Sequence, residues 1–253
     1  MLSIIVPTYN GQSTIAATVE EYIRHFSRQY GQDFEIIIVP NGCTDQTSQI
    51  VKECHLRFPQ VSSREFKARI GKGGAVIEGF RMARGDVVAF VDADGATAPA
   101  ELEKLVIALE GCDGVIGSRW VRGSNVVTRQ PLSRRIASRG FNFLVRLLLH
   151  LPFKDTQCGA KVFRKQAIDR VLPSLQVTNF AFDVELLYRL CNSGHQVKEV
   201  PITWQDKVGS TLNLKAVVPA MFMALLKVRW LGRRSGREGQ ERRLEPHVDR
   251  VGD

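Results

Sequence analysis

The sequence has few cysteines and no hydrophobic run long enough to cross a membrane. Its five cysteines are scattered and none forms a C-x-x-C pair, which argues against a zinc site and a disulfide framework. The uncharged apolar stretch at 216–226 has eleven residues, whereas a helix needs about 20 to span a bilayer. An apolar segment begins directly after Met1 and leaves no room for a signal peptide or an N-terminal anchor. We therefore expect a protein of the reducing cytosol.

Acidic residues are outnumbered, and several familiar motifs are missing. The 26 acidic and 35 basic residues give a formal net charge of +9, which favours anionic partners such as phosphorylated substrates, nucleic acid or an acidic membrane surface. The basic residues form no single run and no RNA-module aromatic signature accompanies them, so we expect no nucleic-acid partner. The segment Gly71–Gly74 matches neither a Walker A loop nor Gly-x-Gly-x-x-Gly. No two of the five histidines stand at metal-ligand spacing.

What the sequence does contain is a regular alternation of apolar strands and helices. In the first half we expect strands at 3–6, 34–39, 61–66 and 87–91, and helices at 13–26, 47–57 and 71–84. Nearly continuous apolar strands between helices predict an α/β domain with a mostly parallel central sheet covered on both faces. Ligands of such sheets lie beyond the carboxyl ends of the strands.

The second half continues with mixed elements and a basic C-terminus. We expect helices at 99–109, 129–151 and 182–191, strands at 114–117 and 197–204, and a loop with a short strand at 155–163. A helix at about 214–231 ends in cations, and it either lies among lipid headgroups or packs on the core. Residues 232–253 lack apolar periodicity and predict a disordered tail.

Two carboxylates follow the strand at 87–91. Asp92 and Asp94 stand two apart on the turn, where they can hold one Mg²⁺ or Mn²⁺ against a diphosphate, although a solvated acidic turn has the same pattern. Lys72 and Gly73 begin a helix whose backbone N–H groups can approach a phosphate, unless this is an ordinary strand-to-helix turn.

Further charged residues gather in the second half. The basic ones near the helix at 129–151 are Arg119, Arg134, Arg135 and Arg139. Guanidinium groups suit phosphate binding, although a solvated basic face would look the same. Asp155, Asp183 and Glu185 add carboxylates. Because Asp183 and Glu185 are two apart on a helix, only one of them can easily point into a shared site.

Several segments form an ordered series between about Ser3 and Gly232. They are Ile5–Asn10, Asn41–Thr47, Gly71–Val76, Ala83–Asp86, Asp92–Gly95, Gly117–Arg119, Asp155–Lys161, Phe182–Glu185 and Glu199–Trp204. The series resembles the inverting GT-A glycosyltransferases of family 2, and more narrowly the dolichyl-phosphate glucose synthases and their polyprenyl-phosphate relatives. The resemblance implies a single GT-A domain over 1–231. Within it, a nucleotide-binding half spans about 1–118, an acceptor half about 119–213 and a membrane-associating helix about 214–231.

The resemblance also implies roles for individual residues. Those expected to hold the nucleotide are Pro7, Thr8, Tyr9, Asn41, Asp45, Lys72 and Gly73. Asp92 and Asp94 should face the metal and the diphosphate. Arg119 and Arg134 match positions that grip the acceptor phosphate and the donor diphosphate, and Arg139 joins them on the acceptor phosphate.

Two positions depart from the family pattern. Many relatives carry paired acids where this chain has Pro40 and Asn41, which puts recognition of the base by a carboxylate in doubt. Mannose-phosphate synthases often have a Gln as a third metal contact where this chain has Ala96. The second departure favours UDP-glucose over GDP-mannose as the donor.

The implied reaction is attack of a lipid phosphate on the anomeric carbon, with inversion. A phosphate is anionic at neutral pH, so no strong base is needed, whereas a hydroxyl acceptor would need one, and Asp155 or Asp183 would be the candidate. A polysaccharide-type transferase would carry Gln-x-x-Arg-Trp, and a pyrophosphorylase would carry a Gly-rich loop after the first strand; both are missing. A non-catalytic basic binding module would not need the Asp pair. We expect a peripheral enzyme at the cytoplasmic side of a membrane, with a nucleotide sugar and a polyprenyl-phosphate lipid as its substrates.

Overall fold

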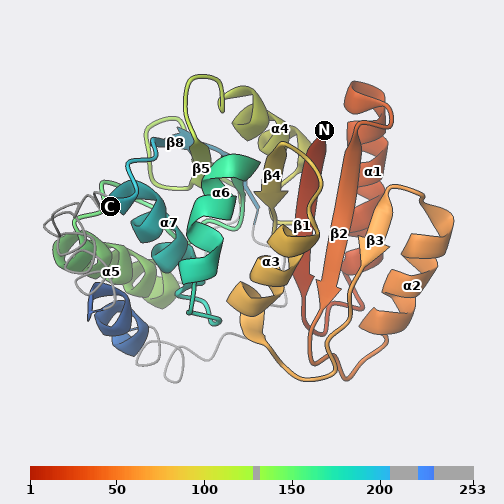
Figure 1. Ribbon diagram of the computed structural model, residues 1–253, viewed down its shortest axis with the longest axis horizontal. Helices are drawn as coiled ribbons and strands as arrows, with labels where there is room; N and C mark the ends of the chain where they lie inside the picture. The colour runs from red at the N-terminus through yellow and green to blue at the C-terminus, as the bar shows by residue number, and fades with distance from the viewer. Residues whose placement is uncertain (128–131, 206–221, 231–253) are drawn as a thin grey trace, which may run out of the picture.

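The computed structural model describes residues 1–127, 132–205 and 222–230, without the side chains of 132–135 and 137. It shows a seven-stranded sheet with helices packed against it (Figure 1). The expected tail at 232–253 and the start of the C-terminal helix at 214–221 lie outside the described residues. The side chains of Arg134 and Arg135 do so as well, and their roles stay predictions.

The first half forms the expected parallel layer. The strands β1 (Leu2–Thr8), β2 (Phe34–Pro40), β3 (Val61–Ser63) and β4 (Val87–Phe90) are joined by the helices α1 (Ile15–Tyr30), α2 (Thr47–Arg57) and α3 (Gly71–Met82). β1 pairs in parallel with both β2 and β4, and β2 with β3. β3 is shorter than the predicted strand at 61–66, because regular pairing ends at Ser63 and resumes only as a bridge between Asn41 and Phe66.

The second half adds three strands and makes the sheet mixed. β7 (Lys161–Arg164) runs antiparallel between β4 and β5 (Gly114–Ser118), and β8 (Val197–Pro201) pairs in parallel with β5 at the edge. The resulting order is β3-β2-β1-β4-β7-β5-β8. The sheet is therefore mostly parallel, and the predicted fold class is confirmed.

The single strand expected at 197–204 is wrong. β8 ends at Pro201, which has no N–H to continue the ladder. A separate strand, β9 (Thr203–Trp204), then pairs with β6 (Asn125–Val126) in a small second sheet. Between them Ile202 bonds to both layers, since its N–H donates to Ser118 O at 3.2 Å and its carbonyl accepts from Asn125 N at 3.1 Å.

The remaining helices are α4 (Pro99–Ile107), α5 (Leu132–Leu149), α6 (Lys165–Val171), a 3₁₀ turn (Leu172–Ser174), α7 (Phe182–Asn192) and a helix at 222–230. α6 was not among the predicted elements. Helices α3, α5, α6, α7 and 222–230 cover one face of the sheet, and α1, α2 and α4 cover the other.

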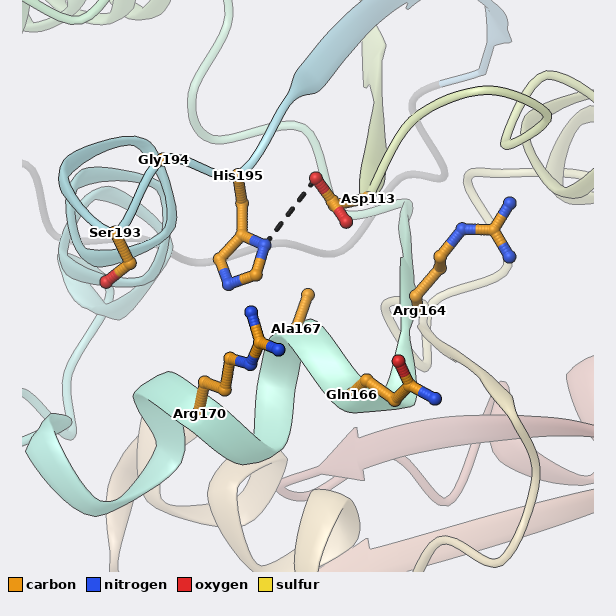
Figure 2. A pocket seen from close by; sticks show the side chains of 8 residues that line it. All are labelled: Asp113, Arg164, Gln166, Ala167, Arg170, Ser193, Gly194 and His195. Atoms are coloured by element: carbon orange, nitrogen blue, oxygen red, sulfur yellow. Dashed lines mark ion pairs between the residues drawn. The ribbon is translucent and has the colours of Figure 1, made fainter.

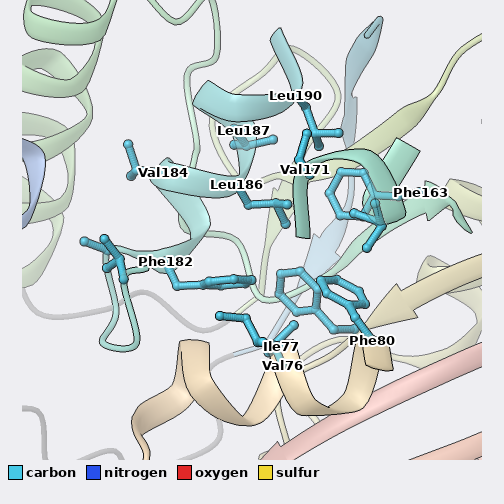
Figure 3. Packing of buried hydrophobic residues seen from close by; sticks show 14 of the residues in the cluster. Val76, Ile77, Phe80, Phe163, Val171, Phe182, Val184, Leu186, Leu187 and Leu190 are labelled. Carbon is cyan, nitrogen blue, oxygen red and sulfur yellow. The ribbon is translucent and has the colours of Figure 1, made fainter. Parts of the chain in front are cut away.

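Two hydrophobic clusters, one on each face, explain the continuous apolar strands. Neighbouring strand residues point to opposite faces, so Ile37 joins one cluster and Ile36 the other. On the α3 side, Phe90 lies between Phe80 and Phe182, with ring centroids 6.2 and 6.3 Å away. Figure 3 shows Phe80 of α3 and Phe182 of α7 within this cluster.

An ion pair between the buried Glu35 and the exposed Arg84 fixes the chain before β4. The carboxylate of Glu35 accepts hydrogen bonds from the backbone N, Nε and Nη2 of Arg84 at 2.8–3.0 Å and from Ser3 Oγ at 2.7 Å. Burial alone would raise the pKa of Glu35, but these bonds and the charge of Arg84 lower it below its ordinary value. The segment Ala83–Asp86, one of those behind the family resemblance, thus has a structural role here.

The helix at 222–230 packs on the core with one face. Ala224, Leu225 and Val228 are buried in the α3-side cluster, and Arg229 Nη1 donates to Leu148 O of α5 at 2.7 Å. The opposite face leaves large apolar side chains exposed, so packing on the core and contact with lipid do not exclude each other. No helix within the described ranges is long and apolar enough to span a membrane.

Candidate active site

Charged and polar side chains converge beyond the carboxyl ends of β1, β2, β4 and β5. These strands run in the same direction, so Thr8, Asn41, Asp92 and Arg119 reach the same edge of the sheet. β7 runs the opposite way, so its first residue, Lys161, lies at that edge as well. This is where ligands of open α/β sheets bind.

Asp92 lies at the centre of this cluster. Its Oδ1 is 2.7 Å from Lys72 Nζ, and Lys72 is also 3.8 Å from Asp183 Oδ2. Burial would raise the pKa of Asp92, but the ammonium of Lys72, followed by Lys161 and Arg119, holds it below its ordinary value. Asp92 also lies directly against Gly159, where an added Cβ would be 1.9 Å from Oδ2. Only glycine leaves room for this carboxylate.

A buried ion pair between Lys161 and Asp183 lies next to Asp92 and Lys72. Lys161 is fully buried, and its Nζ donates to Asp183 Oδ1 at 2.6 Å and to Cys158 O at 2.5 Å. Glu185 points away and accepts from the backbone N–H groups of Gln176 and Val177. α7 therefore directs only Asp183 toward the cluster. Sequence reasoning gave Lys161 no role, although a lysine inside an apolar strand was a signal that could have found it.

Arg119 is held by Asp155 in a two-pronged ion pair. Its Nε and Nη2 donate to the two carboxylate oxygens at 2.7 and 2.9 Å, and its backbone N donates at 3.0 Å. Asp155 is fully buried; burial would raise its pKa, but Arg119 lowers it, so the carboxylate stays ionised. Both oxygens are engaged, which fits an anchor for Arg119 better than a general base.

Arg119 and Arg139 share an aromatic neighbour, Trp120. The guanidinium of Arg119 lies 5.7 Å from the ring centroid of Trp120 and 5.4 Å from that of Trp204. Arg139 of α5 lies 5.0 Å from the same Trp120 ring. Trp120 Nε1 is buried without a hydrogen-bond partner in the described part of the chain. Trp120 was not among the predicted site residues.

The residues expected at the nucleotide base divide into two groups. Asn41 Nδ2 donates to Thr8 O at 3.0 Å, while Asn41 Oδ1 and Thr8 Oγ1 are buried without partners among the described residues. Tyr9 is half exposed, with the Arg69 guanidinium 4.3 Å from its ring centroid. Buried polar atoms of Thr8 and Asn41 therefore lie at the carboxyl ends of β1 and β2, where the aromatic ring of Tyr9 comes next along the chain after Thr8.

Other expected nucleotide contacts are already engaged within the protein. Asp45 accepts from the N–H of Thr47 at 3.0 Å and of Gln12 at 3.2 Å, so it organises the turn before α2. Pro7 is buried within β1. The N–H of Gly73 donates to Thr178 O at 2.9 Å, and a Cβ there would be 2.4 Å from Phe182 Cβ. The glycine thus permits close packing of α3 on α7, and its N–H is engaged within the protein.

Comparisons with known proteins fit this geometry. The model of the family described as glycosyl transferase family 2 matches residues 3–172. The dolichyl-phosphate beta-glucosyltransferase of Saccharomyces cerevisiae is 34% identical over 231 residues, covering 84% of this chain and 69% of that protein. This chain belongs to glycosyl transferase family 2.

Other relatives of the transferase differ in length or only share its fold. Glycosyltransferase AglD of Haloferax volcanii is 31% identical over 232 residues; these cover 90% of this chain but 37% of that protein. A crystal structure of glucosyl-3-phosphoglycerate synthase from Mycobacterium tuberculosis with Mn²⁺, UDP and phosphoglyceric acid superposes with a TM-score of 0.64. It is 20% identical, with 90% of this chain and 78% of that one covered, and shows the fold alone.

The carboxylates of the transferase suit a divalent cation bound against a diphosphate. The described residues contain no group of three or more His, Cys, Asp or Glu side chains that could hold a metal ion by itself, so Asp92 and Asp94 would share the ion with oxygens of the substrate or water. In the structure, Oδ1 of Asp92 is paired with the ammonium of Lys72 at 2.7 Å. Asp94 Oδ1 accepts from Ala96 N at 2.9 Å, which orients this second carboxylate.

A cavity of about 320 Å³ lies at the opposite edge of the sheet in the transferase. Asp113, just before β5, and His195, just before β8, line it, with Nδ1 of His195 3.5 Å from Asp113 Oδ2 (Figure 2). Because this is the edge where the parallel strands begin, the cavity is separate from the cluster around Asp92. Its place gives no reason to assign it to the transfer reaction.

Proposed function

We propose that this glycosyltransferase transfers glucose from UDP-glucose to a polyprenyl phosphate, with Mg²⁺ or Mn²⁺ at Asp92 and Asp94, as a peripheral enzyme on the cytoplasmic side of a membrane. The proposal rests on one observation above all: the guanidinium groups of Arg119 and Arg139 lie 5.7 and 5.0 Å from the centroid of the same Trp120 ring, and the charge of Arg119 acts on Asp92. The relatives add support, since the human dolichyl-phosphate beta-glucosyltransferase is 32% identical over 225 residues.

On the donor side, the unpartnered polar atoms near Tyr9 match the chemistry of uracil. Asn41 Oδ1 can accept only, and the imide N–H of uracil is a donor. An amide acceptor replaces the carboxylate that many relatives place in this region. The diphosphate would lie over Asp92, Asp94 and Lys72, where a bound divalent cation neutralises charge on the leaving group.

On the acceptor side, the two arginines supply a phosphate clamp. Two hydrogen bonds to Asp155 fix the plane of the Arg119 guanidinium. The positive charge of Arg119 is thereby held close enough to act on Asp92. Arg139 lies on α5 and faces the same indole ring. A phosphate bridging the two would sit between the donor site and the helix, and Arg134 remains a candidate third contact. Guanidinium groups bind phosphate through several N–H bonds at once.

The reaction needs positioning more than proton transfer. The acceptor oxygen is already anionic, so the arginines need only hold it in line with the bond between the anomeric carbon and the diphosphate. Asp183 is buried and paired with Lys161 and Lys72, and it would hold both lysines toward the diphosphate. Transfer to a hydroxyl acceptor would require Asp183 to leave this pairing and act as a base, which the geometry disfavours.

The experiment is a transfer assay with purified protein, a short polyprenyl phosphate and Mg²⁺ or Mn²⁺, comparing labelled UDP-glucose with GDP-mannose. We expect lipid-extractable label from UDP-glucose, abolished by EDTA. Lipid-extractable label from GDP-mannose instead would show that the enzyme is the alternative, a polyprenyl-phosphate mannosyltransferase. No lipid product from either donor would contradict the proposed reaction.

A further inference from the structure

Large apolar side chains are exposed in a strongly uneven way. Among the described residues twelve are exposed, and eight of them lie on α5 and the helix at 222–230. These eight are Ile136, Phe143, Leu144, Leu147, Phe222, Met223, Leu226 and Trp230. We call them the apolar face. Soluble monomers rarely expose such a concentration without a partner.

Each helix presents its part of the face as one stripe. On α5, Ile136, Phe143 and Leu147 recur at helical spacing, while Val145 and Leu149 are buried on the opposite side. On the second helix, the same helical spacing places Met223, Leu226 and Trp230 in one exposed stripe. The two helices adjoin at one end of the molecule (Figure 1), joined by the bond from Arg229 to Leu148 O. Both helices are therefore anchored to the core through their buried sides.

The charges on the two helices that carry the apolar face all have one sign. α5 and residues 222–230 contain no Asp or Glu. They contribute cations that include Arg139 and Arg146 on α5 and Lys227 and Arg229 on the second helix. Apolar side chains bordered by cations match the boundary between hydrocarbon and anionic headgroups. A second copy of the chain fits less well, because a symmetric dimer would set like charges against each other.

We propose that the apolar face docks the enzyme on an anionic lipid bilayer, with α5 and the helix at 222–230 lying side by side in the headgroup region. This deepens the proposed function. Arg139 belongs to α5 and contacts the same ring as Arg119. A docked α5 therefore holds the arginine clamp at the depth of lipid phosphates, while an acceptor's polyprenyl chain stays in the hydrocarbon.

The test is co-sedimentation of the full chain with vesicles that contain no polyprenyl phosphate. One set is phosphatidylcholine alone and the other includes phosphatidylglycerol. We expect binding to the anionic set, weakened by salt. Phe143→Gln/Leu147→Gln and Met223→Gln/Leu226→Gln should each lower the partition coefficient about tenfold or more, since each removes two inserted apolar groups. Lys227→Gln should lower it about fivefold, the effect of losing one cation near anionic lipid.

The matched control is Leu56→Gln/Ile107→Gln, which changes two side chains that are 85% and 69% exposed outside the apolar face. This variant should bind as the wild type does. Absence of wild-type binding, equal binding to both vesicle sets or equal loss in the control would overturn the proposal. So would a wild-type dimer in analytical ultracentrifugation that Phe143→Gln/Leu147→Gln converts to monomer. Because no donor or acceptor is present, failure here is distinguishable from failure of the transfer reaction.

Discussion

Replacing Gly159 with alanine places a methyl group in the space of the Asp92 carboxylate. The new Cβ would be 1.9 Å from Oδ2 and 2.4 Å from Cγ of Asp92. Because unstrained contacts need about 3.5 Å, the carboxylate has to retreat by roughly 1.5 Å. That displacement also disturbs its 2.7 Å contact with Lys72.

We expect Gly159→Ala to lower the catalytic rate strongly and to reduce the stability of the fold only slightly. A misplacement of about 1 Å in a reacting site can lower the rate about 100-fold, or about 2.7 kcal/mol in the barrier. The methyl group meets the end of a side chain that can rotate. The loss of stability should therefore not exceed the roughly 1–3 kcal/mol that overpacking a core typically costs. kcat/KM for UDP-glucose and a thermal melt measure the two effects.

Two further variants decide whether the loss acts through Asp92. Gly140 lies on α5 with nothing within 4 Å of an added Cβ, so Gly140→Ala should keep its activity and gain up to about 1 kcal/mol of stability. In an Asp92→Asn background, Gly159→Ala should add little further loss, because both changes remove the same carboxylate contact. Wild-type activity in a folded Gly159→Ala protein, or full additivity with Asp92→Asn, would refute the reasoning.

Three other substitutions probe the site and the core. Asp94→Asn should remove most transfer activity and leave the melting temperature unchanged; full turnover would contradict the metal assignment. Asp155→Asn should destabilise the fold by about 3–5 kcal/mol in denaturant titrations and raise the KM for the acceptor, because it leaves the buried charge of Arg119 poorly paired. Glu35→Gln should cost about 1.5–3 kcal/mol at neutral pH. The pKa of Glu35 is lowered by folding, so its contribution is full above the unfolded value and disappears as the pH falls through the folded pKa. Thermal melts of both proteins should therefore converge at low pH; a constant difference would count against this ion pair.

The parallel layer could be predicted because both faces of its strands are buried. That burial requires runs such as Phe34–Val39, and the turns after them place Asn41 and Asp92 at one edge. The direction of β7 and the break at Pro201 could not be predicted in the same way. These features depend on long-range strand pairing. The four residues Lys161–Arg164 do not indicate by themselves whether the strand runs parallel or antiparallel to its neighbours.

Within the site, the sequence predicted which residues are present better than it predicted which hydrogen bonds and contacts they make. The pair Asp92 and Asp94 and the arginine Arg119 were evident from pattern and resemblance. The bond that engages the Gly73 N–H comes from a loop about a hundred residues away, so local sequence could not reveal it. Trp120 was missed because an aromatic residue next to an arginine has no local signature.

The central claim is that the arginine clamp receives a lipid phosphate. It is tested most directly by offering the enzyme, with UDP-glucose and Mn²⁺, a polyprenyl phosphate and the polyprenol of the same length. We expect glucose on the phosphate and none on the alcohol, with Arg139→Gln raising the KM for the phosphate. Transfer to the alcohol at a comparable rate would contradict the claim and would point to Asp183 as a general base.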